Sequence, residues 1–222
     1  MPAPRLADPA TRPTRVTVRT GVLQIGVLAS HEGTTLQAII DACAQGCING
    51  RVAAVISNNS GSGALRRAAA AGIQTFHLSS VTHSSGDSLD AAICGALQRA
   101  RADVIFLAGY MKRLGPRTLA AYPGRILNTH PALLPRFGGQ GMFGDRVFEA
   151  VLAGGESESG ASVHLVDAEY DTGAVVRQER IPILADDTVA SLKARVQVCE
   201  REAVVKTLAA IASGELVLGR PG

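Results

Sequence analysis

An amide and an imidazole lie two residues apart in this chain, directly after a short apolar run. The residues are Asn128 and His130, and Ile126 and Leu127 precede them. If that run is a β-strand, both side chains point to the same side, because side chains in a strand alternate between its faces. An amide can donate to an oxyanion and an imidazole can carry a proton, and acyl-type transfer requires both groups.

A second histidine and a carboxylate follow further along the chain. His164 lies in the run of residues 162–166, and Asp171 comes shortly before Gly173. A carboxylate beside an imidazole favours its charged form, so Asp171 could set the pKa of His130 if the chain folds back to it. Two plainer interpretations stay open. His164 could be a core or edge histidine with a hydrogen-bond partner, and Asp171 could be a turn former.

The segment of residues 31–35 is a candidate anion site. It contains Gly33, Thr34 and Thr35 between an expected strand and an expected helix. Backbone N–H groups at a helix N-terminus bind anions, and phosphate is the natural ligand. The segment lacks the lysine of a Walker A loop and the three glycines of a dinucleotide fingerprint. The alternative is an ordinary N-cap by Thr34 or Thr35.

Short apolar runs alternate with helical periodicity through the first half of the chain. The expected strands are residues 22–29, 52–56, 73–78, 103–107 and 126–127, and the expected helices are residues 34–44, 64–71 and 89–100. This alternation is typical of a parallel sheet covered by helices on both faces. Ligands of such sheets bind beyond the carboxyl ends of the strands, where the candidate residues lie.

The C-terminal third has a different pattern. Residues 161–166 and 175–183 resemble an antiparallel strand pair, and residues 188–211 form an amphipathic helical pattern. The fold class is therefore α/β, a Rossmann-like open twisted sheet that is mostly parallel, with an antiparallel C-terminal part. We expect one domain over residues 21–222 and a flexible leader over residues 1–20, which hold four arginines and four prolines.

The composition restricts the function. The chain is 46% hydrophobic and 4% aromatic, so we expect an aliphatic core. The net charge of +3 arises within residues 1–20, so the rest is neutral and lacks the basic surface that nucleic acid demands. The sequence contains no run of about 18 apolar residues that would predict a membrane-spanning helix. The N-terminus has no apolar signal region, and the spacing of the four cysteines matches no zinc or redox motif, so we expect a cytoplasmic protein with free thiols.

Five strings of residues resemble the phosphoribosylglycinamide formyltransferases. They are LQAIIDAC (36–43), LAGYMKRL (107–114), ILNTHPALLP (126–135), GASVHLV (160–166) and DTG (171–173). The match runs in order from about residue 21 to residue 218. The resemblance implies transfer of a formyl group from 10-formyltetrahydrofolate to the amine of glycinamide ribonucleotide, in purine biosynthesis and without a metal.

The family's roles carry over to the matching positions. The resemblance implies four catalytic residues, Asn128, His130, Asp171 and His164. It implies that the ribonucleotide is bound by Gly33, Thr34, Thr35, Gln197 and Glu200. It implies that the folate is enclosed by Met111, Lys112, Arg113, Leu114, Asn128, Asp167, Ala168, Glu169, Tyr170 and Asp171. The acid at 171 would raise the pKa of His130, so that a protonated ring and Asn128 both donate to the formyl oxygen.

Several positions depart from the family pattern. Residues 137–144 replace a Pro-Gly-x-His-type stretch, and Thr35 stands where an asparagine is common. Gly86 stands where some members have a folate-contacting arginine. Lys112 and Arg113 replace an Arg-Ile pair and add charge beside the folate.

Three other functions compete with this one. A formyltetrahydrofolate deformylase shares the fold but carries an extra N-terminal domain, for which residues 1–20 leave no room. A formyltransferase for initiator tRNA carries a C-terminal nucleic-acid-binding domain and a basic surface. A non-catalytic nucleotide-binding module would not need Asn128, His130 and Asp171 together. We therefore expect small-molecule substrates, no nucleic-acid or membrane partner, and a monomer or homodimer.

Overall fold

The computed structural model describes residues 21–167 and 169–218, so the expected leader and Ala168 lie outside the described residues. These residues form one seven-stranded sheet in the order β3-β2-β1-β4-β5-β6-β7. The strands are β1 (Leu23–Leu28), β2 (Gly50–Ser57), β3 (Thr75–His77), β4 (Val104–Leu107), β5 (Ile126–His130), β6 (Glu158–Leu165) and β7 (Val175–Pro182). The helices are α1 (Thr34–Ala44), α2 (Gly63–Ala70), α3 (Gly86–Arg99), α4 (Pro116–Ala121), α5 (Asp145–Ala153) and α6 (Val189–Ser213).

The strand pairing confirms the predicted fold class. Strands β1 to β5 pair in parallel, and β6 and β7 continue the sheet in the antiparallel sense. The strand order reverses beside β1, because β2 and β4 lie on its two sides. Loops after parallel strands diverge at such a switch point and leave a crevice for ligands. The loops after β1, β4 and β5 therefore meet at one edge of the sheet.

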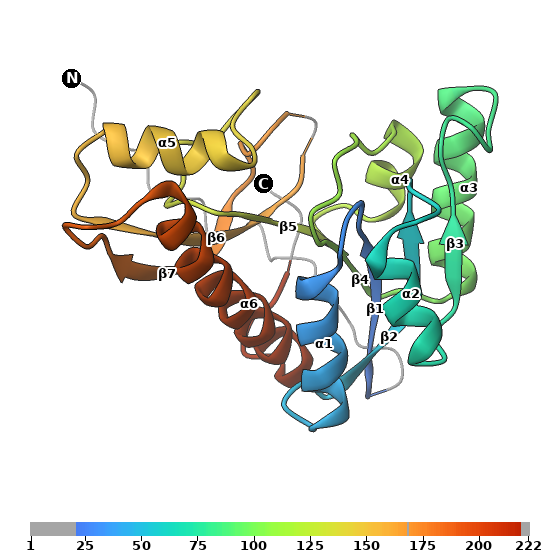
Figure 1. The fold of residues 1–222 in the computed structure, drawn as a ribbon. Helices are drawn as coiled ribbons and strands as arrows, with labels where there is room; N and C mark the ends of the chain where they lie inside the picture. The colour runs from blue at the N-terminus through green and yellow to red at the C-terminus, as the bar shows by residue number, and fades with distance from the viewer. Residues whose placement is uncertain (1–20, 168, 219–222) are drawn as a thin grey trace, which may run out of the picture.

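Helices cover both faces of this sheet (Figure 1). Side chains of α1, α2 and α6 share one core cluster with Leu127 and Val163, while α3 and α4 belong to a second cluster with Ile126. Helix α5 packs on α6 through a third cluster. No helix in the described part of the chain is both long and apolar enough to span a membrane.

The structure contains two helices that the sequence analysis missed. Helix α4 has only six residues, which is too short to show a helical period. Helix α5 follows the glycine-rich stretch and buries Val147, Phe148 and Val151, whose spacing is helical and was an available signal. The other predicted elements are present with shifted ends, and α1 has the predicted bounds.

A buried carboxylate of α3 anchors the start of α4. Asp90 of α3 is 5% exposed. One carboxylate oxygen accepts from the backbone N–H of Arg117 at 2.7 Å. The other accepts from the Thr118 N–H at 3.1 Å and the Thr118 hydroxyl at 2.5 Å. Asp90 thus satisfies donors of the first turn of α4 that have no partner within the helix.

We expect Asp90→Ala to lower the free energy of unfolding by about 3 kcal/mol, because it leaves these buried donors unpaired. Urea unfolding followed by circular dichroism measures this. Asp87→Ala is the matched control, since Asp87 is exposed in the first turn of the same helix. A loss no larger than that of the control would contradict the capping role.

Candidate active site

The end of β5 directs its side chains to two faces of the sheet. Asn128 pairs with His164 of β6, and His130 pairs with Ser162. Asn128 and His130 lie on the same side, as the alternation predicts, and Thr129 between them points to the opposite side. The catalytic candidates of two antiparallel strands are therefore neighbours because of the sheet register.

The carboxylate of Asp171 lies between the two imidazoles. Its Oδ2 is 3.4 Å from Nδ1 of His130, and its Oδ1 is 3.4 Å from Nε2 of His164. The backbone N–H of Gly139 donates to Oδ2 at 3.0 Å. The loop after β6 thus folds back to β5, and the four residues expected to be catalytic form one cluster.

His130 is bound at both nitrogens and is 3% exposed. Its Nε2 is 2.6 Å from the carbonyl oxygen of Phe137. A carbonyl only accepts, so Nε2 carries a hydrogen, and Nδ1 faces Asp171.

Asp171 raises the pKa of His130 as expected, but burial of the ring has a larger and opposite effect. Burial lowers the pKa of His130 below 6.5, and this outweighs the opposite effects of Asp171 and of the Phe137 carbonyl. His164 lowers the pKa further. Proximity to one carboxylate predicts the sign of that single contribution, but the sequence does not show how deeply the ring is buried.

Asp171 keeps its negative charge despite partial burial. Burial raises its pKa, but the hydrogen bonds from His164 and Gly139 and the nearby rings together hold the pKa below its ordinary value of 3.8. An anion therefore lies ready beside His130, and it stabilises the ring once the ring accepts a proton.

His164 orients the amide of Asn128. Its Nδ1 donates to the carbonyl of Leu165 at 2.9 Å. Its Nε2 lies 3.2 Å from the Asn128 amide nitrogen and 3.4 Å from Oδ1 of Asp171. The amide of Asn128 is therefore held beside the His164 ring and close to the Asp171 carboxylate.

These side chains open into a cavity of about 90 Å³. Its lining residues are Leu107, Tyr110, Lys112, Arg113, Leu114, Leu119, Asn128, His164, Val166, Asp167, Glu169, Tyr170 and Asp171. Most of the residues expected to enclose the folate therefore line this one cavity. Met111 is not in this lining, and its backbone N–H donates to Ser30 at 2.9 Å. His130 lies behind Asp171.

Two segments from distant parts of the sequence meet at this cavity. The guanidinium of Arg113 lies over the ring of Tyr170, 4.8 Å from its centroid, and pairs with Glu169 at 3.5 Å. Arg113 is one of the departures from the family pattern, and it joins the loop after β4 to the loop after β6. The stacked pair gives the cavity a flat cationic and aromatic rim.

The anion segment after β1 adopts a different cap from the one predicted. Gly33 is the N-cap of α1 with φ +72°, and no side chain caps the helix. A Cβ atom at Gly33 would lie 2.7 Å from Cα of Ala64, so the position requires glycine. The N-cap by Thr34 or Thr35 is therefore wrong, and the first backbone N–H groups of α1 have no partner within the helix.

The last two expected residues lie on α6, across the sheet from Asn128 and His130. The Glu200 carboxylate accepts a hydrogen bond from the Thr129 hydroxyl, and Gln197 is exposed. Burial raises the pKa of Glu200, and the bond from Thr129 acts in the opposite direction. Sequence reasoning missed Thr129, although the strand alternation already put it on the face opposite Asn128.

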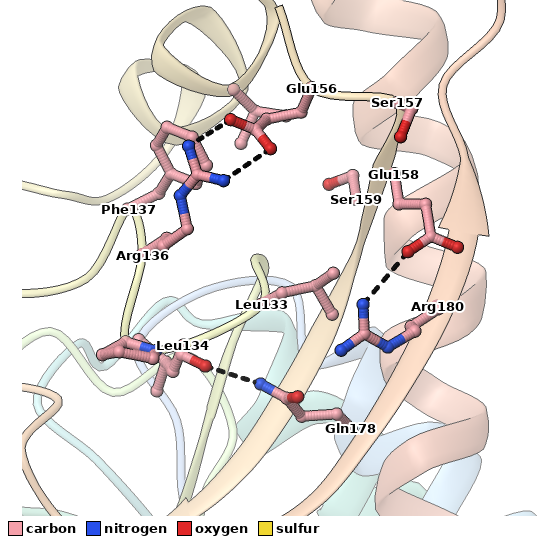
Figure 2. A pocket seen from close by; sticks show the side chains of 12 residues that line it. Leu133, Leu134, Arg136, Phe137, Glu156, Ser157, Glu158, Ser159, Gln178 and Arg180 are labelled. Atoms are coloured by element: carbon pink, nitrogen blue, oxygen red, sulfur yellow. Dashed lines mark hydrogen bonds and ion pairs between the residues drawn. The ribbon is translucent and has the colours of Figure 1, made fainter. Parts of the chain in front are cut away.

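A larger cavity of about 240 Å³ lies away from these residues (Figure 2). Two ion pairs border it, Arg136 with Glu156 and Arg180 with Glu158. It contains no residue expected in the site. Its wall includes Phe137, whose carbonyl accepts a hydrogen bond from His130.

Within the described residues, no three His, Cys, Asp or Glu side chains are grouped to hold a metal ion. All four cysteines are free thiols.

Comparisons of the sequence and of the fold with known proteins agree on one family. The formyl transferase family model matches residues 23–208. The chain is 38% identical over 194 residues to phosphoribosylglycinamide formyltransferase of Escherichia coli K12, covering 87% of this chain and 89% of that protein. It is 40% identical over 195 residues to the enzyme of the same name from Mycobacterium tuberculosis, covering 87% of each. The crystal structure of glycinamide ribonucleotide transformylase 1 from Symbiobacterium toebii superposes with a TM-score of 0.82 at 36% identity, covering 91% of this chain and 96% of that one.

The burial of His130 predicts a pH-dependent stability. The unfolded ring takes up a proton near pH 6.5, whereas the folded ring, with its lowered pKa, resists protonation until a lower pH. The unfolded state therefore binds more protons just below pH 6.5, and the free energy of unfolding falls as the pH falls. We expect His130→Gln to flatten this slope between about pH 6.5 and pH 5 in urea unfolding. Equal slopes in the two proteins would show that the ring titrates normally.

Proposed function

Because this chain belongs to the formyl transferase family, we propose that it transfers a formyl group from 10-formyltetrahydrofolate to the amine of glycinamide ribonucleotide. The products are formylglycinamide ribonucleotide and tetrahydrofolate, in de novo purine biosynthesis. The observation that carries the proposal is the cluster of Asn128, His130, His164 and Asp171, three of which line one cavity.

The cavity beside the cluster suits the folate ring system. Leu107, Leu114 and Val166 supply apolar surface, while Asp167 and the backbone at its rim supply polar groups. A flat heteroaromatic ring needs this combination of apolar walls and a few polar contacts. The Arg113 guanidinium stacked on the Tyr170 ring extends the flat surface toward solvent.

The opposite side of β5 suits the ribonucleotide. The unpaired N–H groups at the start of α1 attract a phosphate, and the helix dipole adds to this attraction. The carboxylate of Glu200 accepts hydrogen bonds from hydroxyl groups. The amine would then reach the formyl carbon around the end of β5, where Asn128 and His130 lie.

The reaction begins with attack of the glycinamide amine on the formyl carbon. A C–N bond forms, and negative charge develops on the formyl oxygen. The side-chain amide of Asn128, held beside His164, donates an N–H to this oxygen. A donor already oriented in a buried site stabilises developing charge without reorganisation.

Proton transfer completes the exchange. The neutral His130 accepts the proton that the attacking amine releases, and the imidazolium is stabilised by the Asp171 carboxylate 3.4 Å away. The proton then passes to the departing folate nitrogen as its bond to the formyl carbon breaks. A buried ring with a lowered pKa is a suitable carrier, because it binds the proton only while the charge is compensated.

The proposal involves small-molecule substrates in the cytoplasm and requires neither a metal nor a nucleic-acid partner. It applies equally to a monomer and to a homodimer.

The direct test mixes the pure protein with glycinamide ribonucleotide and a 10-formylfolate analogue, and follows release of the deformylated folate by absorbance. A parallel sample omits the ribonucleotide. Release only with the ribonucleotide supports the transferase. Equal release in both samples indicates a hydrolase, and no release in either contradicts the proposal.

We expect Asn128→Ala to lower kcat by about 100- to 1000-fold, because one oriented donor to the developing oxyanion is lost. The KM values for both substrates should change little, since the amide acts mainly in the transition state. Initial-rate measurements test this, with Asn49→Ala as the control because Asn49 is exposed and its side-chain amide donates to the carbonyl of Gly21. A rise in KM without a loss of kcat would show that Asn128 binds substrate rather than the transition state.

A further inference from the structure

Thr129 lies between two catalytic candidates but faces the other side of the sheet. Leu127, two residues before it, shares a core cluster with side chains of α1 and α6. Thr129 points to this same face, because side chains two apart in a strand are on one side. It is 9% exposed, and its hydroxyl donates to Oε1 of Glu200 on α6.

This hydrogen bond fixes one oxygen of a buried carboxylate. Burial raises the pKa of Glu200, while the Thr129 hydroxyl and the charge of Arg201 lower it. The bond therefore favours the ionised form and selects one orientation of the carboxylate. The second oxygen, Oε2, accepts no hydrogen bond from any residue that the structure describes. A ligand hydroxyl can use that oxygen.

The same end of the same face carries the start of α1. Helix α1 begins after β1, and α1 and α6 contribute to one core cluster on this face. The backbone N–H groups of Thr34 and Thr35, which have no partner within the helix, thus lie on the same face of the sheet as a carboxylate with one unused oxygen. An anion site and a hydroxyl acceptor on one face match a sugar phosphate, with its phosphate on α1 and its hydroxyls toward α6.

We propose that Thr129 is a positioning residue for the ribonucleotide, acting by holding the Glu200 carboxylate in the orientation that receives the sugar hydroxyls. This inference rests on the proposed function. It assigns the central residue of the Asn128-Thr129-His130 triplet to one substrate and the two outer residues to the transfer step. Three consecutive residues of β5 thereby serve both the ribonucleotide on one face of the sheet and the transfer step on the other.

Thr129→Val tests the inference, because valine keeps the shape of the side chain and removes only the hydroxyl. We expect the KM for glycinamide ribonucleotide to rise by about tenfold, the size of one lost hydrogen bond to a charged group. The kcat and the KM for the formyl donor should stay within about twofold. Thr129→Ser, which restores the hydroxyl, should recover most of the lost affinity.

Thr207→Val is the matched control. Thr207 is 0% exposed on α6, and its hydroxyl donates to the carbonyl of Ala203 within the same helix. This variant also removes a buried hydroxyl from the same layer, so it reports any general effect of the threonine-to-valine change. Its KM for the ribonucleotide should match the unaltered protein. Thermal midpoints and circular dichroism of all variants check that they fold.

A double variant locates the effect at Glu200. If Thr129 acts through that carboxylate, Thr129→Val combined with Glu200→Gln should raise the KM no further than Glu200→Gln alone. Additive effects would overturn the inference, and so would an unchanged KM in Thr129→Val or a loss of kcat with both KM values unchanged. Activity of the unaltered protein with the ribonucleotide is measured separately, so failure of the proposed function is distinguished from failure of this inference.

Discussion

The site depends on one carboxylate held between two imidazoles. Asp171 lies 3.4 Å from both His130 and His164, and each ring supports a different task. His130 is placed to carry a proton, and His164 orients the amide of Asn128. Because Asp171 keeps a lowered pKa, a single negative charge is available to both rings at neutral pH. Strands β6 and β7, the loop between them that carries Asp171, and the glycine-rich stretch all contribute to holding that charge in place.

Strand alternation places the candidate site residues on two faces of β5. Asn128 lines the smaller cavity, His130 lies on the same side behind Asp171, and Thr129 faces α6 on the other side. A strand end is a suitable place for this division, because its backbone is fixed by pairing on both sides, with β4 and β6. The two proposed substrate sites therefore share one short segment of strand but use different side chains of it.

Periodicity and turn residues were enough to predict the alternating strands and helices, the antiparallel end of the sheet and the common side of Asn128 and His130. The resemblance supplied the candidate residues, and the structure brings the four catalytic candidates together. The charge state of His130 was beyond the sequence, because it depends on burial by residues from several elements. The acceptor for its Nε2 was equally inaccessible, since the backbone carbonyl of Phe137 has no signature in residue type.

The departure from the family pattern at residues 137–144 supports two of the candidate catalytic residues. Phe137 accepts from His130, and two residues later the N–H of Gly139 donates to Asp171. Between them, a Cβ atom at Gly138 would lie 2.4 Å from the side chain of Leu134 and 3.4 Å from Cβ of Asp171. A side chain there would push the stretch away from both catalytic groups. Glycine at position 138 therefore allows the backbone of this segment to reach the ring and the carboxylate together, so the departure changes how these candidate residues are held.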